Sequence, residues 1–357
     1  YNPRRSGKAT EGIVVMESKE PRAKPWYNAL YSFVTVLVVF GALYSTFFFF
    51  STLRAVAART TLPDVAGAPS TQPTDVPPAK QESPQVAQRK EPINILLLGI
   101  DERQNSAGPW LSDTIILISI DPVRNEAAML SIPRDLWVTI PGYGQGRINM
   151  AHLIGDVRKY PGGGAALAKA TVWNTLGVPV HYYVRANFWA FEQLIDAMGG
   201  LTIDVKTAIH DDQYPDENYG IMTIEIPAGV QHMDGKTALQ YVRSRHGNSD
   251  YDRMSRQQTV LLAARDKLLS GEIPLSRIPK LIEIGMGSLK TDLPLGEILA
   301  LSDLAKNIGA YQIRQGIIDT SMTETFITPE GWMVEVADWE KVRQLVNDLF
   351  PSPTPIG

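Results

Sequence analysis

The sequence predicts an α/β fold, a three-layer α/β/α sandwich with a mixed central sheet, preceded by one transmembrane helix. Continuously apolar segments of strand length recur from residue 94 onwards, and segments of helical character alternate with them. Mixed strands covered by helices on both faces give a sandwich and not a barrel. The membrane helix is predicted from a stretch without charged residues, Pro25 to Leu53, which is long enough to cross a bilayer.

Basic residues are distributed unevenly around this apolar stretch. Six precede it, whereas only Arg54 and Arg59 follow closely. The positive-inside rule therefore predicts a cytoplasmic tail at residues 1–28, a transmembrane helix at 29–53 and an extracytoplasmic location for the rest of the chain. A cleaved signal peptide is the alternative, because Ala55-Val56-Ala57 could serve as a cleavage site. The apolar region is, however, longer than the ~7–15 residues usual in signal peptides.

Residues 54–92 are predicted to form a disordered, proline-rich stalk. The segment 60–92 holds seven prolines and few large apolar residues. One globular domain is predicted at residues 93–350, followed by a short tail at 351–357. The net charge of −4 leaves nucleic-acid binding without support. The absence of cysteine excludes disulfides, thiolate metal sites and a cysteine nucleophile.

Three predicted strands open the domain, at residues 94–100, 113–120 and 126–132. Short connections favour an antiparallel arrangement of consecutive strands. The end of the first strand, the start of the second and the end of the third then meet at one edge of the sheet. The charged residues at these positions are Asp101, Asp113, Arg134 and Asp135. We therefore predict that they gather at one mouth, although each alone could simply cap a strand or a turn.

Helices and strands alternate after this point. A helix is predicted at residues 165–176 and a strand at 181–187. Asn187 is predicted to cap a helix that Gly199-Gly200 ends. The further predicted elements are strands at 201–205 and 221–226 and a helix after Asp234-Gly235. The acidic segment HDDQYPDENYG (210–220) is interpreted as a solvated loop.

The segment YVRSRHGNSDYDRMSRQQ (241–258) concentrates arginine in an otherwise acidic chain. Arg243 and Arg245, two residues apart, would point the same way in an extended chain. A helix is predicted to follow, with Asp250 or Asp252 as its N-cap. On one face of this helix the spacing places Arg253, Arg256 and Gln257. Such guanidinium groups beside a helix N-terminus favour phosphate binding, and the alternative is a surface cluster of salt bridges.

Four motifs occur in a fixed order: LLLGID, SDTIIL, SIPRD and YVRSR followed by DYDRMSRQQ. Together with a short cytoplasmic tail, one anchor and an outer domain, they resemble the LytR–CpsA–Psr family of cell-envelope glycopolymer transferases. The resemblance covers roughly residues 93–270. It implies a transfer of a glycopolymer from a polyprenyl-pyrophosphate lipid carrier to a peptidoglycan acceptor through a phosphodiester, at the cytoplasmic membrane.

The resemblance also assigns roles to residues. Asp101 and Asp113 match the carboxylates that hold Mg²⁺, and with Arg134 they are the catalytic candidates. The pyrophosphate-binding candidates are Arg134, Arg243, Arg245, Arg253 and Gln257. Asp250 and Arg256 lie inside the motif and are further candidates for this site. The lipid also requires an apolar pocket in the domain.

Two other functions use the same residues. With water as the acceptor, the site would be a polyprenyl-pyrophosphate phosphatase. A non-catalytic lipid-binding or regulatory envelope protein is the third interpretation, and it leaves the two metal-type carboxylates without a purpose. No Gly-x-Ser-x-Gly sequence is present, which argues against a serine hydrolase.

Overall fold

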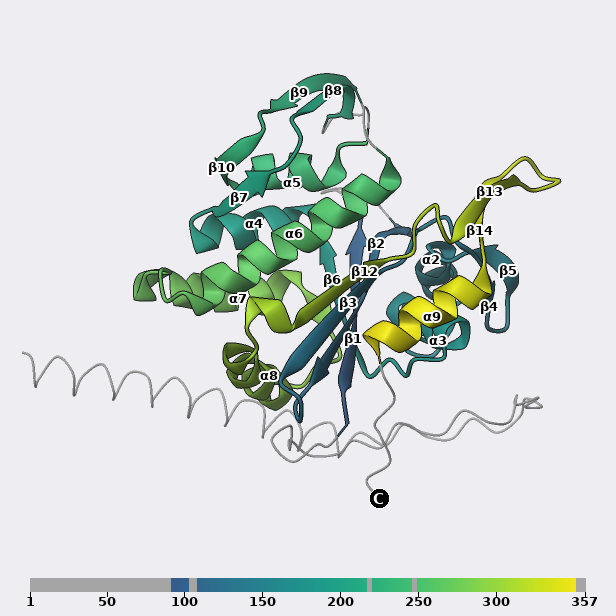
Figure 1. Cartoon of the computed structure of the whole chain (residues 1–357), viewed down its shortest axis with the longest axis horizontal. Coiled ribbons are helices and arrows are strands. Elements are labelled where there is room, and N and C mark those ends of the chain that lie inside the picture. The colour runs from purple at the N-terminus through teal and green to yellow at the C-terminus, as the bar shows by residue number, and fades with distance from the viewer. Residues whose placement is uncertain (1–90, 103–107, 217–219, 246–248, 351–357) are drawn as a thin grey trace, which may run out of the picture. The chain divides into compact units, whose positions relative to one another are not determined.

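The computed structural model describes residues 91–102, 108–216, 220–245 and 249–350. Within these ranges the central element is a six-stranded mixed sheet in the order β11-β6-β1-β2-β3-β12 (Figure 1). Its strands are β1 (Ile93–Ile100), β2 (Ser112–Asp121), β3 (Glu126–Ser131), β6 (Tyr182–Asn187), β11 (Lys290–Thr291) and β12 (Ile313–Ile317).

The first three strands form the antiparallel meander that the sequence predicts. β1 pairs antiparallel with β2, and β2 pairs antiparallel with β3. β6 lies parallel to β1 and β12 lies parallel to β3. Parallel neighbours require a crossover, and helices that cover the sheet lie in these longer connections. The prediction of a mixed sheet is therefore confirmed.

One face of the sheet is covered by α2 (Met150–Val157), α3 (Gly163–Leu176) and α9 (Trp339–Leu349), which lie together on one side in Figure 1. Strands β1 and β2 send every second side chain into this layer, among them Leu96, Leu98 and Leu117. These side chains pack on Leu167, Val172, Val342 and Val346 of the helices. The result is the largest continuous apolar core of the described residues. We call this side of the sheet the packed face.

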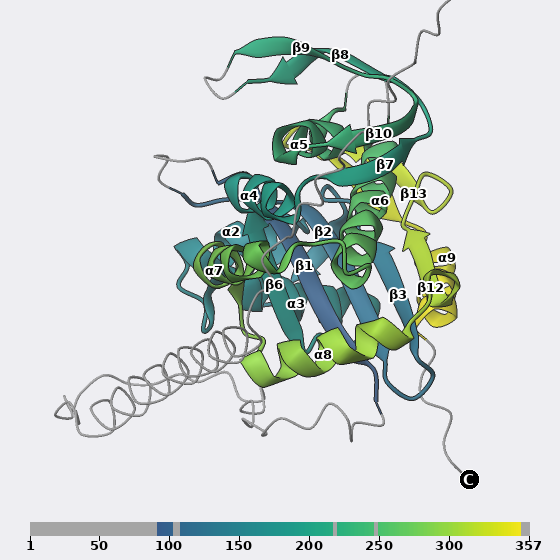
Figure 2. The same cartoon turned by 90° about the vertical axis from the view of Figure 1, so that its left-hand side faces the viewer.

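The other face carries α4 (Phe188–Met198), α5 (Gly235–Arg243), α6 (Asp250–Leu269), α7 (Ile278–Ser288) and α8 (Leu295–Asn307), as Figure 2 shows. Helix α8 covers the start of β1, where Ile93 and Ile95 contact Leu293 and Leu301. Helices α4, α5 and α6 share a separate core with β7 (Leu201–Val205). Helices thus cover both faces of the sheet, as predicted.

Helix α4 begins and ends where the sequence predicts. The side chain of Asn187 accepts a hydrogen bond from the backbone N–H of Ala190 at 2.8 Å. Gly199 ends the helix with φ +85°, a left-handed conformation that costs glycine little. Because β6 ends at Asn187, this cap fixes α4 directly after the strand that pairs with β1.

Four two-stranded antiparallel sheets complete the described part of the domain, and three of them are hairpins. They are β4 (Trp137–Ile140) with β5 (Gly144–Arg147), β7 with β10 (Gly229–Met233), β8 (Ile209–Pro215) with β9 (Ile221–Ile226), and β13 (Thr323–Ile327) with β14 (Met333–Ala337). Short 3₁₀ turns lie at Leu275–Arg277 and Ala310–Gln312. The interpretation of residues 210–220 as a solvated loop is wrong, because strand β8 occupies most of this segment. Ile209, Asp211 and Tyr214 of this strand are buried.

The predicted cytoplasmic tail (1–28), transmembrane helix (29–53) and C-terminal tail (351–357) lie outside the described residues. The same is true of the predicted stalk (54–92), apart from its last two residues. Among the helices that the structure describes, none combines the length and the apolar character needed to cross a membrane.

Candidate active site

A cavity of about 500 Å³ lies between the central sheet and helices α4, α5 and α6. Its wall on the sheet side consists of Leu97, Leu98, Gly99, Thr114, Ile116, Val184 and Ala186. Its wall on the helix side includes Phe188, Phe191, Leu194, Ile195, Met198, Leu239, Val242, Val260, Leu261 and Ala264. The cavity is thus lined mainly by apolar side chains, as sites for small molecules and lipids commonly are.

Small residues on the sheet help to keep this space open. Gly99 lies opposite Thr114 in the ladder between β1 and β2. A Cβ atom at position 99 would lie 2.8 Å from the Cβ of Thr114, closer than two such atoms approach. Glycine at position 99 therefore lets the two strands pair closely and sends no side chain into the cavity.

All seven residues that were predicted to bind the metal or the pyrophosphate line this one cavity: Asp101, Asp113, Arg134, Arg243, Arg245, Arg253 and Gln257. Asp101 follows the last residue of β1, Asp113 is the second residue of β2, and Arg134 follows β3. The antiparallel meander brings these three to one edge, as its geometry requires. We call this charged rim the mouth of the cavity.

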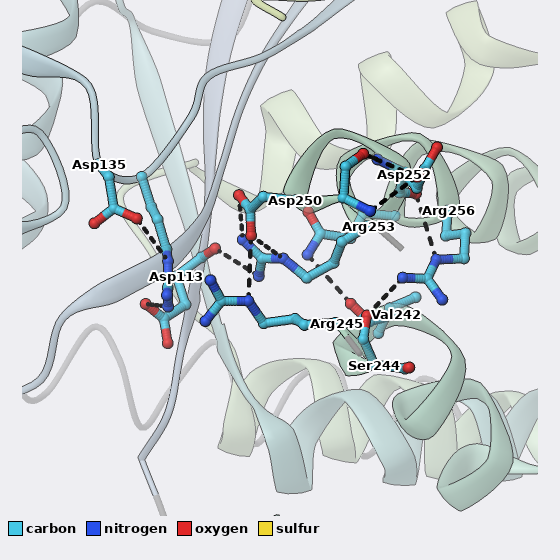
Figure 3. Close-up of polar contacts among 12 residues, drawn as sticks. Asp113, Asp135, Val242, Ser244, Arg245, Asp250, Asp252, Arg253 and Arg256 are labelled. Atoms are coloured by element: carbon cyan, nitrogen blue, oxygen red, sulfur yellow. Dashed lines mark hydrogen bonds and ion pairs between the residues drawn. The ribbon is translucent and has the colours of Figure 1, made fainter. Parts of the chain in front are cut away.

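Arg134 lies between two carboxylates (Figure 3). Its Nη1 donates to Oδ1 of Asp113 at 2.8 Å, and its Nε lies 3.4 Å from Oδ2 of Asp135. Burial acts to lower the pKa of Arg134, but the charges of Asp113 and Asp135 outweigh it and raise the pKa above its ordinary value. Arg134 is therefore a fixed positive charge at the start of β2. Its buried Nε makes no hydrogen bond to any residue that the structure describes.

Helix α6 starts earlier than either predicted N-cap would allow. Ser249 is the N-cap, not Asp250 or Asp252, because Ser249 and Asp252 form a capping box. The hydroxyl of Ser249 accepts from the N–H of Asp252 at 3.1 Å, and the Asp252 carboxylate accepts from the N–H of Ser249 at 3.0 Å. The Asp250 carboxylate is therefore not the N-cap of the helix and can bind a side chain of the site.

Arg253 joins α6 to the mouth. Its Nε and Nη2 donate to the two oxygens of Asp250 at 3.0 and 3.1 Å, a bidentate pair. Its Nη1 donates to the backbone carbonyl of Asp113 at 3.1 Å. This buried guanidinium thus fixes the first turn of α6 against the start of β2, while its edge still lines the cavity.

Asp250 balances part of the positive charge at the mouth (Figure 3). Burial acts to raise the pKa of Asp250, but Arg253, Arg245 and Arg134 outweigh it and hold the pKa below its ordinary range. Arg245 lies 3.4 Å from Asp250, and its side chain is 47% exposed. Burial and the neighbouring charge of Arg134 lower the pKa of Arg245. Arg245 is therefore held beside other cations, and a bound anion would stabilise this concentration of positive charge.

Arg243 and Arg245 do not share the face of an extended segment, and that prediction is wrong. Asp234 caps helix α5 by accepting from Thr237 N–H, and the helix continues to Arg243. Arg243 donates to the hydroxyl of Tyr214 at 3.0 Å, and its guanidinium lies over the ring of Phe188 at 4.0 Å. Although the two arginines lie on different local structures, both line the cavity.

Arg256 is not among the residues that line the cavity. It donates through Nη2 to the carbonyl of Ser244 and through Nε to the carbonyl of Asp252 at 3.3 Å. Its guanidinium also lies over the ring of Tyr241. Arg256 therefore fixes the connection between α5 and α6, whereas Gln257, one residue later, faces the cavity and donates to Val242 O.

Asp211 is a polar residue of the site that the sequence did not reveal. It is 1% exposed and lines the cavity. One carboxylate oxygen accepts from the hydroxyl of Ser244 at 2.8 Å and from the N–H of Arg245 at 3.3 Å. Asp211 thus fixes the backbone that carries Arg245. The sequence carries no apolar alternation that would mark this strand, because the pairing of β8 with β9 is irregular between Asp211 and Tyr214.

Two carboxylates at the mouth, Asp101 and Asp113, offer oxygen ligands of the kind that a divalent cation takes, and Oδ1 of Asp113 also accepts from Arg134. The described residues contain no group of three or more histidine or acidic side chains arranged around one metal position. A cation held by two carboxylates must complete its shell with water or ligand oxygens, which is the preference of Mg²⁺ and not of zinc. The residues present fit Mg²⁺ on these grounds.

Residues 64–348 match the model of the LytR_cpsA_psr family. The chain is 32% identical over 287 residues to the polyisoprenyl-teichoic acid–peptidoglycan teichoic acid transferase TagU of Oceanobacillus iheyensis, covering 80% of this chain and 82% of that protein. It is 36% identical over 218 residues to the transferase of the same description, TagT, of Bacillus subtilis, covering 59% and 63% of the two chains.

Solved structures share the fold. A structure described as TagT bound to LI-WTA matches with a TM-score of 0.58 and 28% identity, over 76% of this chain and 93% of that chain. The crystal structure of B. subtilis TagV matches with a TM-score of 0.58 and 27% identity, over 75% of this chain and all of that chain.

Proposed function

The chain belongs to the LytR–CpsA–Psr family, and from this premise we propose that it is a Mg²⁺-dependent phosphotransferase. The proposed reaction transfers a glycopolymer from a polyprenyl-pyrophosphate carrier to a hydroxyl of peptidoglycan and forms a phosphodiester. The similar proteins TagU and TagT are named as transferases of polyisoprenyl-linked teichoic acid to peptidoglycan.

One observation supports the proposal most strongly: a mainly apolar cavity ends at a mouth with four arginines, Arg134, Arg243, Arg245 and Arg253. This combination matches an amphiphile with an apolar chain and a multiply charged head. A polyprenyl pyrophosphate has both parts, because its isoprenoid chain is apolar and its diphosphate is anionic. Guanidinium groups bind phosphate oxygens through paired N–H donors, which makes arginine well suited to this head group.

In this proposal each residue at the mouth has a separate role. Arg245 and Arg253 bind the diphosphate, and Arg134 neutralises the charge that develops at the phosphorus. Asp101 and Asp113 would hold Mg²⁺, which supplies further neutralisation of the phosphate oxygens when bound. Asp250 keeps Arg253 and Arg245 oriented, and Asp211 fixes the backbone of Arg245.

The bonds change at one phosphorus atom. The oxygen of the acceptor hydroxyl forms a bond to the phosphorus that carries the glycopolymer. The bond from this phosphorus to the bridging oxygen of the pyrophosphate breaks, and the polyprenyl monophosphate leaves with the electron pair. The hydroxyl proton passes to a carboxylate, and both Asp101 and Asp113 are candidates. With water as the acceptor the same steps would give hydrolysis.

Substitution of the carboxylates tests the proposal. Asp113→Asn and Asp101→Asn should each abolish transfer to a peptidoglycan acceptor. Thermal unfolding should stay close to that of the parent, because both residues lie at the rim and outside the apolar cores. Arg158→Ala serves as the control, since Arg158 is an exposed residue at the end of α2 and should retain activity.

Three outcomes would contradict the assignment. Full transfer in excess chelator would exclude the metal. Release of the free glycopolymer phosphate in place of the ligated product, with the acceptor present, would identify a phosphatase. Binding of lipid pyrophosphate without turnover in the parent would identify a lipid-binding protein.

We also propose a location in the cell membrane, with the N-terminus in the cytoplasm and the domain outside. The support is the charge distribution around residues 29–53. Protease added to intact protoplasts should then remove the domain, whereas a tag placed before Pro25 should stay protected. Protection of a C-terminal tag would overturn this orientation.

A further inference from the structure

The two carboxylates at the mouth lie where the ladder between β1 and β2 becomes irregular. The register shifts at the end of β1, where Ile100 pairs with Ser112 and Asp113 is left out of the pairing. Asp101 lies beyond the last paired residue of β1. A bulge of this kind turns side chains away from the regular pattern of a sheet. Contacts outside the ladder must therefore help to set the spacing of the two carboxylates.

Arg185 supplies one such contact from the opposite face of the sheet. It lies on β6 between Val184 and Ala186, which line the cavity, so its own side chain points to the packed face. Its side chain is only 13% exposed, and its Nη2 lies 3.8 Å from Oε2 of Glu102. Glu102 directly follows Asp101 in the chain. A guanidinium on β6 thus holds the start of the connection between β1 and β2.

His152 extends this contact to the other end of the connection. Its Nδ1 lies 3.0 Å from the carbonyl oxygen of Trp110, and its Nε2 lies 3.2 Å from Nη1 of Arg185. A carbonyl oxygen can only accept, so Nδ1 carries the proton and Nε2 accepts from the guanidinium. His152 is fully buried, and this burial lowers its pKa, which favours the neutral ring. Trp110 lies three residues before Asp113.

Helix α2 gives both side chains a rigid support. Asp156, one turn after His152 on this helix, has one oxygen 3.9 Å from Nη1 of Arg185. Its other oxygen accepts from the N–H of Gly164 in α3 at 2.7 Å. A Cβ atom at position 164 would collide with the carbonyl oxygen of His152, so glycine is needed for the close approach of α2 and α3. The partners of Arg185 are therefore fixed to the packed layer.

These contacts lie on both sides of the segment that separates the two carboxylates. Arg185 itself is not among the residues that line the cavity, so its role is not contact with the lipid. Two carboxylates can bind one cation together only while their spacing is maintained. Groups that orient metal ligands from behind commonly cost about 10- to 100-fold in metal affinity when they are removed.

We propose that Arg185, supported by His152, is a positioning residue for Asp101. By holding both described ends of the connection between β1 and β2, it sets the spacing of Asp101 and Asp113. This inference rests on the proposed function, in which these two carboxylates hold Mg²⁺, and it deepens that function. It adds residues of the packed face to a site that opens on the other face of the sheet.

The first test measures the binding of Mn²⁺ alone, in place of Mg²⁺, to the full chain in detergent micelles without lipid. The electron paramagnetic resonance signal of the free ion reports the Kd. Arg185→Met removes the charge and keeps much of the length, and it should raise the Kd about 10-fold or more. Arg185→Lys should recover part of this loss, because one ammonium group keeps the charge but cannot make the contacts of both guanidinium arms.

Arg314→Met is the matched control. Arg314 lies in the same sheet on β12, pairs with Glu126 at 3.4 Å and does not line the cavity. Its replacement removes a comparable ion pair and should leave the Mn²⁺ affinity unchanged. An effect of equal size in this control would reduce Arg185 to a structural residue and overturn the inference.

Turnover gives a second readout. In Arg185→Met, half-maximal transfer should require about 10-fold more Mg²⁺, and excess Mg²⁺ should restore the turnover. The KM for the lipid donor should stay unchanged, because the arginines at the mouth are intact. A purely structural defect would not be rescued by Mg²⁺, and that result would contradict the inference.

Glu102→Gln is the second variant, because Glu102 is 35% exposed and its replacement is compatible with folding. It should raise the Kd for Mn²⁺ in the same direction, and it decides the question alone if Arg185→Met does not fold. The double variant should bind Mn²⁺ no more weakly than Arg185→Met, since the two residues act as one pair. Additive losses would mean that Glu102 binds the metal directly, and they would overturn the inference.

The outcomes separate this inference from the proposed function. Parent-like Mn²⁺ affinity in both Arg185→Met and Glu102→Gln, with transfer intact, would overturn the inference alone. A parent that binds no Mn²⁺ and transfers fully in excess chelator would overturn the metal role of Asp101 and Asp113, and the inference with it.

Discussion

The packed face of the central sheet and the face that carries the cavity are built from the same strands, and they differ in whether the covering helices leave a cavity. Leu96 of β1 packs in the core beneath α3, whereas Leu97 and Gly99, which alternate with it, line the cavity. On β2, Leu117 packs in that core and Ile116 lines the cavity. Hydrophobic side chains therefore point both ways along each strand.

The two faces differ at the edge of the sheet. Branched side chains and alanines occur on both, for example Leu117 and Ala168 on the packed face and Ile116 and Ala264 at the cavity wall. The cavity has a charged rim, where Asp101, Asp113 and the four arginines lie. An apolar surface can thus stabilise the fold on one side of a sheet and bind a ligand on the other, and the charges at the rim mark the second.

Truncation of one leucine on each face should show the largest difference. Leu117 is 0% exposed in the packed core, so Leu117→Ala should lower the free energy of unfolding by about 2–5 kcal/mol. Leu97→Ala should cost only about 1–2 kcal/mol, because Leu97 is half-buried and already borders open space. Denaturation in urea, followed by circular dichroism, would measure both. Equal losses would mean that the two faces are packed equally well.

Substitution of Arg245 should affect catalysis and not folding. If its planar guanidinium binds a pyrophosphate, Arg245→Lys should lose much of the activity and Arg245→Ala more, at a cost of about 2–4 kcal/mol in transition-state stabilisation. An exposed salt bridge would be worth only about 0–1 kcal/mol, and lysine would replace arginine with little effect. Turnover and lipid-pyrophosphate affinity would be measured beside Arg158→Ala. Parent-like behaviour of both Arg245 variants would move the anion site elsewhere.

Replacement of alanine by phenylalanine should lower stability on the packed face and weaken lipid binding on the cavity face. Ala168→Phe, in the packed core, should destabilise the fold by about 1–3 kcal/mol through overpacking. Ala264→Phe should leave stability near that of the parent because its ring can enter the cavity, and it should weaken lipid-pyrophosphate binding about 10-fold or more. Thermal unfolding and lipid binding would be compared in one series. Unchanged lipid affinity in Ala264→Phe would show that the lipid binds elsewhere.

The charged mouth should contribute a small dependence of stability on pH. The folded state holds the pKa of Asp250 below its ordinary range, so the ionised form stabilises the fold. This contribution is present above the unfolded pKa of about 3.9 and is lost as the pH falls from there through the folded pKa. Asp250→Asn should therefore flatten the stability profile below about pH 4. A profile identical to that of the parent would contradict the role of Asp250 as an ion-pair partner.

Much of the architecture was predictable because it depends on neighbouring residues. The strands of the meander, the cap at Asn187 and the end of α4 at Gly199 follow from local periodicity and turn chemistry. The antiparallel order then placed Asp101, Asp113 and Arg134 at one edge without further information. The assignment of roles to the arginines depended instead on the resemblance to a known family.

Other features depend on contacts between distant segments. Asp211 is buried because it accepts hydrogen bonds from Ser244 and Arg245, more than 30 positions away in the sequence. Arg256 was predicted to face the anion, but the carbonyl of Ser244 in the preceding connection draws it away from the cavity. A charged residue has the same appearance in a sequence whether its partner is water, a ligand or a backbone carbonyl.

The sequence by itself determined the strands, their order at one edge of the sheet and the presence of a concentrated cationic segment. Only the tertiary structure decided that the second apolar face leaves a cavity and that its mouth carries the four arginines. The physical reason is that periodicity reports whether a residue is shielded from water, and a cavity wall and a core are shielded alike. The distance between the sheet and a helix layer depends on all the side chains that separate them. These side chains come from segments that are far apart in the sequence, so no single segment predicts whether a cavity forms.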